Sequence, residues 1–480
     1  MTVIDIKKKE FPLVVDLDGT LIKTDLLYES IIQCIKKNPL MMFLILFWLC
    51  KGKAALKSQL ALLVRIEPET LPYNNDFLTY LKNEFNNGHI LILATASHKT
   101  YAEQIASYLG IFKGVYATDD KINCKGTEKA KICLSRFGEK GFDYAGDSKA
   151  DLKIFKIARK VVLVRPSKAV QRKTKKNGNV DREFIENRGQ LFQYLKAIRI
   201  HQWLKNGLIF VPLITSHKLF DLSLLFTSIT GFFALCLCAS GTYIINDLFD
   251  LNSDRSHPRK KMRPFASGDI PILKGVVLSS LLIVSGLTIS IWLDSAFSFV
   301  LCGYIGLTLG YSLVFKTIAL VDTILLASLY TIRVIAGALL IEVNLSFWLI
   351  TFSIFIFYCL ALLKRVTELQ NLSNSGCEKI NGRGYSLQDA NTLRGMGISS
   401  GLLSIIVFAL YINSSDMLLM YSRPQVLWLI CPLLLYWINM LWLKTGREEM
   451  HDDPIVFTIK DHQSQIVFGL VAMLLAFASG

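Results

Sequence analysis

The hydrophobic residues of this chain follow two contrasting patterns. Up to about residue 195, short apolar runs such as those in FPLVVDLDGTL and VVLVRPS alternate with segments of helical pattern, as in a doubly wound parallel sheet covered by helices. From about residue 203, apolar stretches near membrane-spanning length alternate with short polar loops. We therefore expect an α/β domain over 1–195 and an all-α, multi-pass membrane domain over 196–480.

The membrane domain contains about nine candidate transmembrane helices. Each is an apolar stretch bounded by polar or turn-forming residues. The last of them is short, and no single stretch is much longer than one crossing requires. The candidates are 203–217, 222–245, 272–293, 296–315, 318–341, 345–363, 393–412, 423–443 and 465–480.

The basic residues predict how these spans are oriented. If the first span starts in the cytoplasm, the loops after every second span also face it, and the opposite loops contain only Lys218 and Arg423. By the positive-inside rule, the basic loops are cytoplasmic. The N-terminus, MTVIDIKKKEF, lacks the apolar region of a signal peptide, so we expect an integral inner-membrane protein with a cytoplasmic first domain. The basic loop residues are Arg255, Arg259, Lys260, Lys261, Arg263, Lys316, Lys364, Arg365, Lys379, Arg383, Lys444, Arg447 and Lys460.

Composition narrows the expected partners. The 480-residue chain is 52% hydrophobic and carries a formal net charge of +15. Because the basic residues gather beside apolar spans, the lipid bilayer and phosphorylated substrates are expected partners, whereas nucleic acid is not. The ten cysteines show no CxxC or zinc-finger spacing, which favours core residues in a reducing compartment.

An acidic and basic segment at 241–268 is the strongest chemical signal in the membrane domain. Asp247, Asp250 and Asp254 are spaced by three and four residues, so they share one face with Asn246 one step away if the preceding helix continues. Carboxylates at the end of a membrane helix need a compensating cation, and Mg²⁺ binds one or two carboxylates together with phosphate oxygens. The bases that follow, including Arg255 and Arg263, suit a diphosphate. The alternative is a solvated loop without function.

Further ionisable residues lie in or beside later spans. Asp322 and Arg333 either line a polar cavity, together with Lys316, or pair with each other three turns apart. In KRVTEL, Lys364, Arg365 and Glu368 are candidate functional residues. The alternative for the two bases is an ordinary membrane anchor. Lys205 is a candidate phosphate ligand, and Trp203 beside it fits an interface belt. Asp452 and Asp453 precede the last span, where an acidic helix cap explains them equally well.

The first domain opens with FPLVVDLDGTL, in which a buried-strand pattern ends at Asp16 and Asp18. Carboxylates at the end of a first strand point into the crevice where one can attack phosphorus and the other can handle the proton.

Residues of about 25–90 have the pattern of a helical cap, and the basic segment of about 166–195 is interpreted as a connector or as the solvated end of the domain. Within the cap, the apolar residues 40–50 are too short to span a bilayer; they are either cap core, which is the default, or a surface that rests on the membrane or on the second domain.

These residues resemble the haloacid dehalogenase (HAD) superfamily. DLDGTL, LILATAS, CKGTEKAK and FDYAGDSKAD occur in the order of that family's motifs. The resemblance implies that Asp16 is the nucleophile, that Asp18 is the general acid and base, and that Thr95 and Lys129 hold phosphoryl oxygens, with Lys125 the competing lysine. The implied Mg²⁺ ligands are Asp16, Asp18, Asp147 and Asp151.

The membrane domain resembles the UbiA superfamily of intramembrane prenyltransferases. NDLFDLNSD looks like its first aspartate-rich motif, and RIHQWLKN, HPRKKMRP, KRVTEL and DDPIVF look like the decaprenyl-phosphate phosphoribosyltransferase branch. The second aspartate motif, commonly DxxxD, has only Asp322 here, which puts a second full metal site in doubt. This branch implies transfer of phosphoribose from phosphoribosyl diphosphate to a polyprenyl phosphate with Mg²⁺.

The fusion predicts a bifunctional enzyme, because the transfer product would carry a 5-phosphate that a HAD domain could remove. Two alternatives remain open. One is prenyl transfer from a prenyl diphosphate to an aromatic acceptor, which the single Asp322 and the basic KRVTEL segment disfavour. The other is a catalytically silent HAD domain that localises or regulates the transferase.

Overall fold

A computed structural model describes residues 11–479, except 120–123, 125, 187–188, 345, 374–382, 415–416, 418–420 and 451–452. The chain forms two compact units. Unit 1 comprises Met1–Ile198 and Asp247–Val277, and unit 2 comprises Arg199–Asn246 and Leu278–Gly480. The aspartate-rich segment therefore groups with the first 198 residues rather than with the helices that flank it in sequence.

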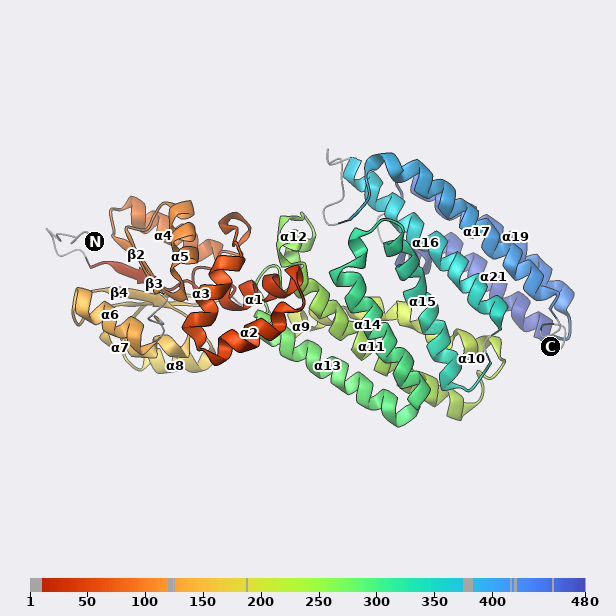
Figure 1. Ribbon diagram of the computed structural model, residues 1–480, viewed down its shortest axis with the longest axis horizontal. Helices are drawn as coiled ribbons and strands as arrows, with labels where there is room; N and C mark the ends of the chain where they lie inside the picture. Colours follow the sequence, from red (N-terminus) through yellow and green to blue (C-terminus); the bar gives the residue numbers. More distant parts are fainter. Residues whose placement is uncertain are drawn as a thin grey trace. The chain divides into compact units, whose positions relative to one another are not determined.

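A six-stranded parallel sheet forms the centre of unit 1. At its middle, Val14 of β1 pairs in register with Ile92 of β2 and Tyr144 of β4. Figure 1 shows α4 and α5 on one side of the sheet and α6, α7 and α8 on the other. The carboxyl ends of β1, β2 and β4 consequently meet at one edge. The strand order is β3 (Gly114–Thr118), β2 (Leu91–His98), β1 (Leu13–Val15), β4 (Asp143–Gly146), β5 (Val161–Val164) and β6 (Val180–Phe184).

The helices of unit 1 confirm an α/β domain with a helical insertion after the first strand. Four of them lie between β1 and β2, where the cap was predicted, and the rest follow the later strands. They are α1 (Leu26–Lys37), α2 (Met41–Cys50), α3 (Lys53–Leu63), α4 (Asn75–Asn86), α5 (Lys99–Leu109), α6 (Thr127–Phe137), α7 (Leu152–Ile157), α8 (Lys168–Lys175) and α9 (Gln190–Ile198).

Two expectations for unit 1 are corrected. The segment interpreted as a connector forms α8 and the edge strand β6, which pairs with β5, because Val170, Val180 and Phe184 have apolar partners in the domain core.

The apolar residues 40–50 are not cap core: α2 buries only Ile45 fully, and most of its large side chains are exposed. A helix that is apolar all round cannot bury every face against two neighbouring helices.

Eight helices among the described residues are long and apolar enough to cross a membrane. The first of the nine predicted spans, 203–217, is instead a 3₁₀-helix (Ile200–Phe210) followed by the short α10 (Val211–Thr215). Its buried Lys205 and Asn206 and its Pro212 do not suit a regular apolar helix. The eight helices are α11 (Leu222–Phe249), α13 (Ile272–Leu293), α14 (Ser295–Leu313), α15 (Val321–Leu340), α16 (Phe347–Ser373), α17 (Ala390–Ile412), α19 (Ile430–Gly446) and α21 (His462–Ser479).

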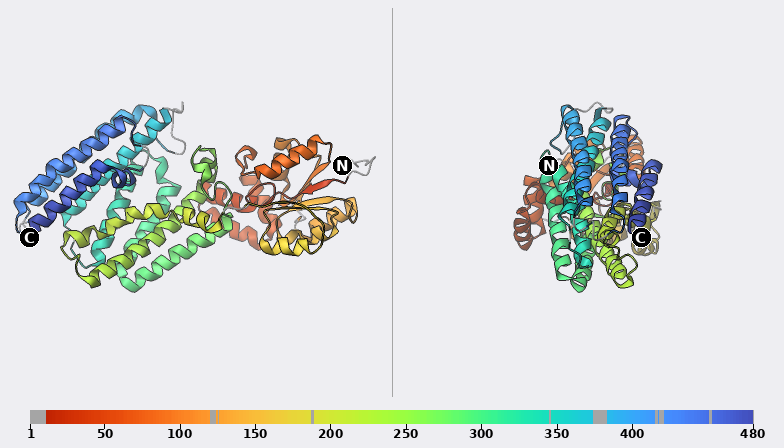
Figure 2. Two further views of the ribbon diagram at one scale, coloured as in Figure 1. Left: turned by 180° about the vertical axis from the view of Figure 1, so that it is seen from behind. Right: turned by 90° about the vertical axis from the view of Figure 1, so that its right-hand side faces the viewer.

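Unit 2 is a helical bundle in which α16 packs along both α15 and α17, as the two views of Figure 2 show. The 3₁₀-helix packs closely on α15 because Gly337 has no side chain. A Cβ at Gly337 would lie 2.0 Å from the carbonyl oxygen of Ile209. This close approach positions the polar residues of the 3₁₀-helix beside those of α15.

Candidate functional site

Three carboxylates meet at the edge of the sheet in unit 1. Asp16 follows β1, Asp147 follows β4, and Asp151 ends the 3₁₀-helix Lys149–Asp151. One oxygen from each lies within 4.8 Å of the others. Gly19, at φ +82°, leaves room for this cluster, since a Cβ there would lie 2.5 Å from Asp147 Oδ2. Three of the four carboxylates that the family resemblance implies as metal ligands therefore meet at one point, and their binding of a metal stays a prediction.

Lys129 is the lysine of this cluster among the described residues. Its Nζ lies 2.6 Å from Asp16 Oδ1 and 3.8 Å from Asp151 Oδ1, and its side chain is buried. It also donates a hydrogen bond of 3.2 Å to the hydroxyl of Tyr144. The competing Lys125 lies outside the described residues. An ammonium at this position can hold a phosphoryl oxygen and can compensate the negative charge that gathers around Asp16.

The carboxylates lie close enough together that a bound cation would stabilise their charged forms. Burial raises the pKa of Asp16 to about 7, with Lys129 opposing the rise and Asp151 and Asp18 adding to it. Burial and the charges of Asp16 and Asp151 also raise the pKa of Asp147 well above its usual value. A divalent cation removes this penalty, and Mg²⁺ prefers carboxylate ligands combined with phosphate oxygens and water. The donor set of Asp16 and Asp147 fits Mg²⁺, with Asp151 as a third acid.

Asp18 lies apart from this cluster, so its carboxylate is not among the grouped metal ligands. Its Oδ2 accepts hydrogen bonds from Ser97 Oγ at 2.6 Å and Thr95 Oγ1 at 3.2 Å, and its Oδ1 accepts one from the backbone N–H of Leu26 at 3.0 Å. The site thus holds two carboxylates in different settings, one beside a lysine and one beside hydroxyls. Such separation suits a nucleophile and a proton carrier.

Mg²⁺ should stabilise the wild-type chain through this cluster. At 100 times the dissociation constant, a ligand that binds only the folded state adds about 2.7 kcal/mol to the free energy of unfolding. We expect a rise in melting temperature on adding Mg²⁺ that is smaller in Asp147→Asn, measured by thermal unfolding in detergent. An equal rise in both proteins would contradict a metal site at Asp147. The same measurement with Ca²⁺ compares the effect of ion size on the melting temperature.

The aspartates of the second candidate site do not share one continuous helix. The helix α11 ends at Phe249, and Asp250 separates it from α12 (Leu251–Ser256). Asp247 and Asp254 nevertheless converge, because both accept hydrogen bonds from Nη1 of Arg263, at 3.1 and 2.6 Å. Asp250 instead lies 3.4 Å from Lys36 Nζ. Burial raises the pKa of Asp254 against the opposing charge of Arg263. Asn246, in the last turns of α11, is half-buried.

Arg255, expected to bind phosphate, has other partners within unit 1. It forms a buried two-point ion pair with Glu29 of α1, at 2.6 and 3.1 Å, and donates to the carbonyl oxygen of Ala266 at 3.1 Å. Thr24 donates a further hydrogen bond to Glu29. A buried charge pair with this geometry is costly to separate. Arg255 is therefore a structural link in this unit, which corrects the phosphate-ligand prediction.

A buried ionic network in unit 2 joins Arg365 and Glu368 of KRVTEL to Asp322 of α15. Arg365 and Asp322, both fully buried, pair at 2.6 Å. Arg365 also contacts Glu368 and the hydroxyl of Tyr311, and Arg383 reaches Asp322 at 3.2 Å. Because its donors are occupied by these partners, Arg365 supports the network rather than offering free donors to phosphate.

Arg333 does not pair with Asp322, so that alternative is wrong. Its Nε donates to Asn206 Oδ1 at 2.8 Å, and its Nη2 donates to the hydroxyl of Tyr304 at 3.1 Å. It thus holds the 3₁₀-helix against α15. Lys316 lies half-buried in a separate 3₁₀-helix, Phe315–Thr317, after α14.

Two lysines from distant segments meet on one carboxylate. Lys205 Nζ and Lys364 Nζ lie 2.7 and 2.8 Å from Asp453 Oδ2. Against the effect of burial, these ammonium groups hold the pKa of Asp453 well below its usual value. Asp453 also caps α20 (Pro454–Lys460) through the backbone N–H of Ile455, which confirms the helix-cap interpretation of this residue. Asp452 lies outside the described residues.

Comparison with known proteins identifies the membrane domain. The sequence pattern of the UbiA prenyltransferase family matches residues 208–460. The chain belongs to this family. Among its relatives, the protein y4nM of Sinorhizobium fredii, whose name describes it as uncharacterised, is 35% identical over 478 residues, which is 99% of this chain and 92% of that protein. The decaprenyl-phosphate phosphoribosyltransferase of Mycolicibacterium smegmatis is 30% identical over 282 residues, which is 57% of this chain and 88% of that protein.

Solved structures resemble each part of the chain. A UbiA homologue from Archaeoglobus fulgidus bound to GPP and Mg²⁺ covers 60% of this chain and 99% of its own, at 14% identity and a TM-score of 0.47. A phosphoserine phosphatase with a phospho-aspartyl intermediate analogue covers 37% of this chain and 95% of its own, at 17% identity and a TM-score of 0.27. The HAD-like character of the domain before the UbiA part rests on its own motifs, parallel sheet and acid cluster.

Several residues of these sites were not predicted from the sequence. Ser97 could have been found, because it follows Thr95 by two residues on a strand and so lies on the same face. Glu29 could not, because its partner Arg255 lies 226 residues away. The same holds for Tyr311 and Arg383 of the UbiA domain, whose contacts depend on how the helices pack.

Proposed function

We propose that this UbiA-family chain is a bifunctional membrane enzyme. Its membrane domain transfers 5-phosphoribose from phosphoribosyl diphosphate to a polyprenyl phosphate, and its HAD-like domain removes the 5-phosphate from the product. The observation that carries this proposal is the fusion itself: the phosphatase-type cluster of Asp16, Asp147 and Lys129 belongs to the same chain as a domain similar to a decaprenyl-phosphate phosphoribosyltransferase.

In the transfer step, the bond between the anomeric carbon and the diphosphate breaks, and a bond from that carbon to a phosphate oxygen of the polyprenyl carrier forms. No protein nucleophile is needed, so positioning and charge stabilisation supply the catalysis. Asp247, Asp250 and Asp254 would hold Mg²⁺, which when bound would supply charge neutralisation at the leaving diphosphate. Arg263 supplies a further positive group beside Asp247 and Asp254. The paired ammonium groups of Lys205 and Lys364 form a second positive centre that suits another phosphate.

In the hydrolytic step, the Asp16 carboxylate attacks phosphorus and forms an aspartyl phosphate. Asp18 gives its proton to the departing ribose oxygen, and it later takes a proton from the water that releases inorganic phosphate. Lys129 and Thr95 hold the phosphoryl oxygens during both displacements. Asp16 and Asp147 would hold Mg²⁺, which when bound would supply charge neutralisation at the phosphoryl group.

Both sites belong on the cytoplasmic side of the inner membrane in this proposal. The basic loops after α11, α14, α16 and α19 support that orientation through the positive-inside rule. They include Arg263 after α11, Lys316 after α14, Arg383 after α16 and Arg447 after α19. The soluble donor, phosphoribosyl diphosphate, is then available on the same side as the HAD-like domain.

The decisive experiment follows the lipid product. Purified protein in nanodiscs is given Mg²⁺, polyprenyl phosphate and ¹³C-labelled phosphoribosyl diphosphate, and the lipids are analysed by mass spectrometry. We expect labelled polyprenyl phosphoribose 5-phosphate to appear first and its dephosphorylated form to follow. Transfer of a prenyl group to an aromatic acceptor from prenyl diphosphate, without any ribosylated lipid, would overturn the proposal.

A further inference from the structure

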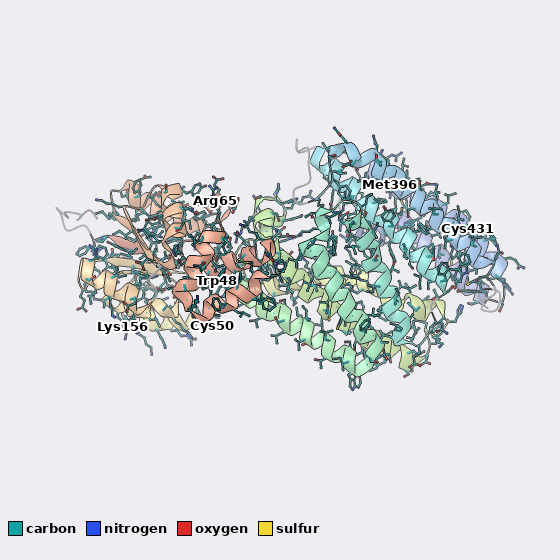
Figure 3. All side chains as sticks on the ribbon, viewed as in Figure 1. Trp48, Cys50, Arg65, Lys156, Met396 and Cys431 are labelled. Carbon is teal, nitrogen blue, oxygen red and sulfur yellow. The ribbon has the colours of Figure 1, made fainter. Side chains whose placement is uncertain are left out.

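Helix α2 has no polar face. Its ten residues, MMFLILFWLC, are all apolar, and in the part of the chain that the structure describes only Ile45 is buried. Phe43 and Phe47 are 65% and 54% exposed, and Leu40 just before the helix is 69% exposed. Leu62, at the end of the neighbouring α3, is 78% exposed. Figure 3 labels Trp48 and Cys50 on this helix. Exposed apolar surface of this extent marks an interaction site.

The chemistry of this surface fits lipid better than a protein groove. A protein groove binds one apolar face of a helix and leaves the opposite face exposed to solvent, whereas α2 is apolar around its whole circumference. Exposed lysines border it, with Lys37 before the helix and Lys51 and Lys53 after it, and Lys51 Nζ lies 4.5 Å from the centre of the Phe47 ring. Lysines beside an apolar helix attract anionic headgroups while their stems stay among acyl chains.

Helix α1, which leads into α2, contacts the segment that directly follows α11 in the sequence. Within unit 1, Lys36 near the end of α1 contacts Asp250, the residue directly after the membrane-length helix α11, and Gln33 contacts Asn252. Helix α2 starts only five residues after Lys36, at Met41. Because the unit is part of a chain with eight membrane-length helices, the effective concentration of lipid around α2 is high.

The two helices that carry α2 both reach the HAD-like site. Helix α1 begins at Leu26, whose N–H donates to Asp18, and Lys57 of α3 donates to the carbonyl oxygen of Ala96, between Thr95 and Ser97. Helix α1 has 12 residues, which spans about 18 Å. A site about this far from an inserted helix can receive a phosphate that is attached to a lipid carrier.

We propose that α2 inserts into the headgroup and acyl boundary of the bilayer and holds the HAD-like site near lipid-linked phosphate. A helix of this kind lies in the plane of the membrane and buries its side chains about 5–10 Å deep. The insertion stands independently of the enzyme activity. The assignment of a lipid-linked substrate rests on the proposed phosphatase function.

Photo-cross-linking in the full chain tests the insertion. The photoreactive amino acid p-benzoylphenylalanine is introduced at Phe43, at Phe47 or at the control position Phe85, which is 45% exposed on α4, and the proteins are irradiated in nanodiscs that contain phosphatidylglycerol. We expect lipid adducts at positions 43 and 47 and at least about tenfold fewer at 85. Equal adduct levels at all three positions, or cross-links at 43 and 47 to protein instead of lipid, would overturn the insertion.

A kinetic comparison tests the substrate assignment. We expect Phe43→Asp with Phe47→Asp to lower phosphate release from the lipid-linked product by at least about tenfold and to leave hydrolysis of p-nitrophenyl phosphate unchanged, with Phe85→Asp as the matched control. An equal loss on both substrates would overturn the assignment of a lipid substrate. If the wild type hydrolyses neither substrate, the proposed phosphatase function fails, whereas the cross-linking result still decides the insertion.

Discussion

The Asp16→Asn variant is expected to release diphosphate at the wild-type rate and to lose phosphate release by about three orders of magnitude or more. Asparagine keeps the size of the side chain but cannot form the aspartyl phosphate. It also removes the carboxylate nearest to Lys129, whose Nζ lies 2.6 Å from Asp16 Oδ1. The measurement follows both products from one reaction with phosphoribosyl diphosphate, polyprenyl phosphate and Mg²⁺, and mass spectrometry should show the 5-phosphorylated lipid accumulating.

Asp143→Asn provides the matched control for Asp16. Asp143 begins β4, at the opposite end of the strand that leads to Asp147, and pairs with Arg159 at 2.6 Å on a partly exposed surface. Its replacement should change phosphate release by less than about twofold, because surface ion pairs contribute about 0–1 kcal/mol to stability. Normal phosphate release from Asp16→Asn would show that another group attacks phosphorus or that a different domain performs the hydrolysis.

Replacing Asp247 and Asp250 together with alanine is expected to lower diphosphate release by about 10²–10³-fold or more. These carboxylates are proposed to hold the cation that neutralises the leaving group. Removing Asp247 also leaves Asp254, 2.6 Å from Arg263 Nη1, as a carboxylate partner of that guanidinium, so the positive charge remains while two of the three proposed cation ligands are lost. Hydrolysis of p-nitrophenyl phosphate should be retained, which separates loss of transfer from loss of folding.

Asp221→Asn is the control for this second prediction. Asp221 caps the start of α11 through the N–H groups of Ser223 and Leu224, about 40 Å along the helix from Asp247. Asparagine also caps helices well, so diphosphate release should be unchanged. Intact turnover in the Asp247 and Asp250 double variant, or labelling of cysteines at these positions from the outer side of the membrane, would rule out the proposed cytoplasmic site.

The two acidic clusters differ in how well their geometry could be predicted from the sequence. Asp16 and Asp147 each follow a buried strand, and parallel strands bring their carboxyl ends to one edge, so their meeting could be predicted from order alone. Asp247, Asp250 and Asp254 were expected on one helical face. The helix ends at Phe249, because the segment after it packs within unit 1, and local spacing does not contain that information.

The sequence by itself determined the alternation of strands and helices and the membrane character of the second half, since each depends on periodicity. It also predicted which acids are reactive, from residues close in the chain. Tertiary structure alone decided which charges meet. Glu29 with Arg255, Asp322 with Arg365, and Lys205 and Lys364 with Asp453 are pairs drawn from separate elements. It also decided that α2 stays uncovered. A hydrophobic pattern specifies that a surface avoids water, but only the packing of the other elements determines whether protein covers it.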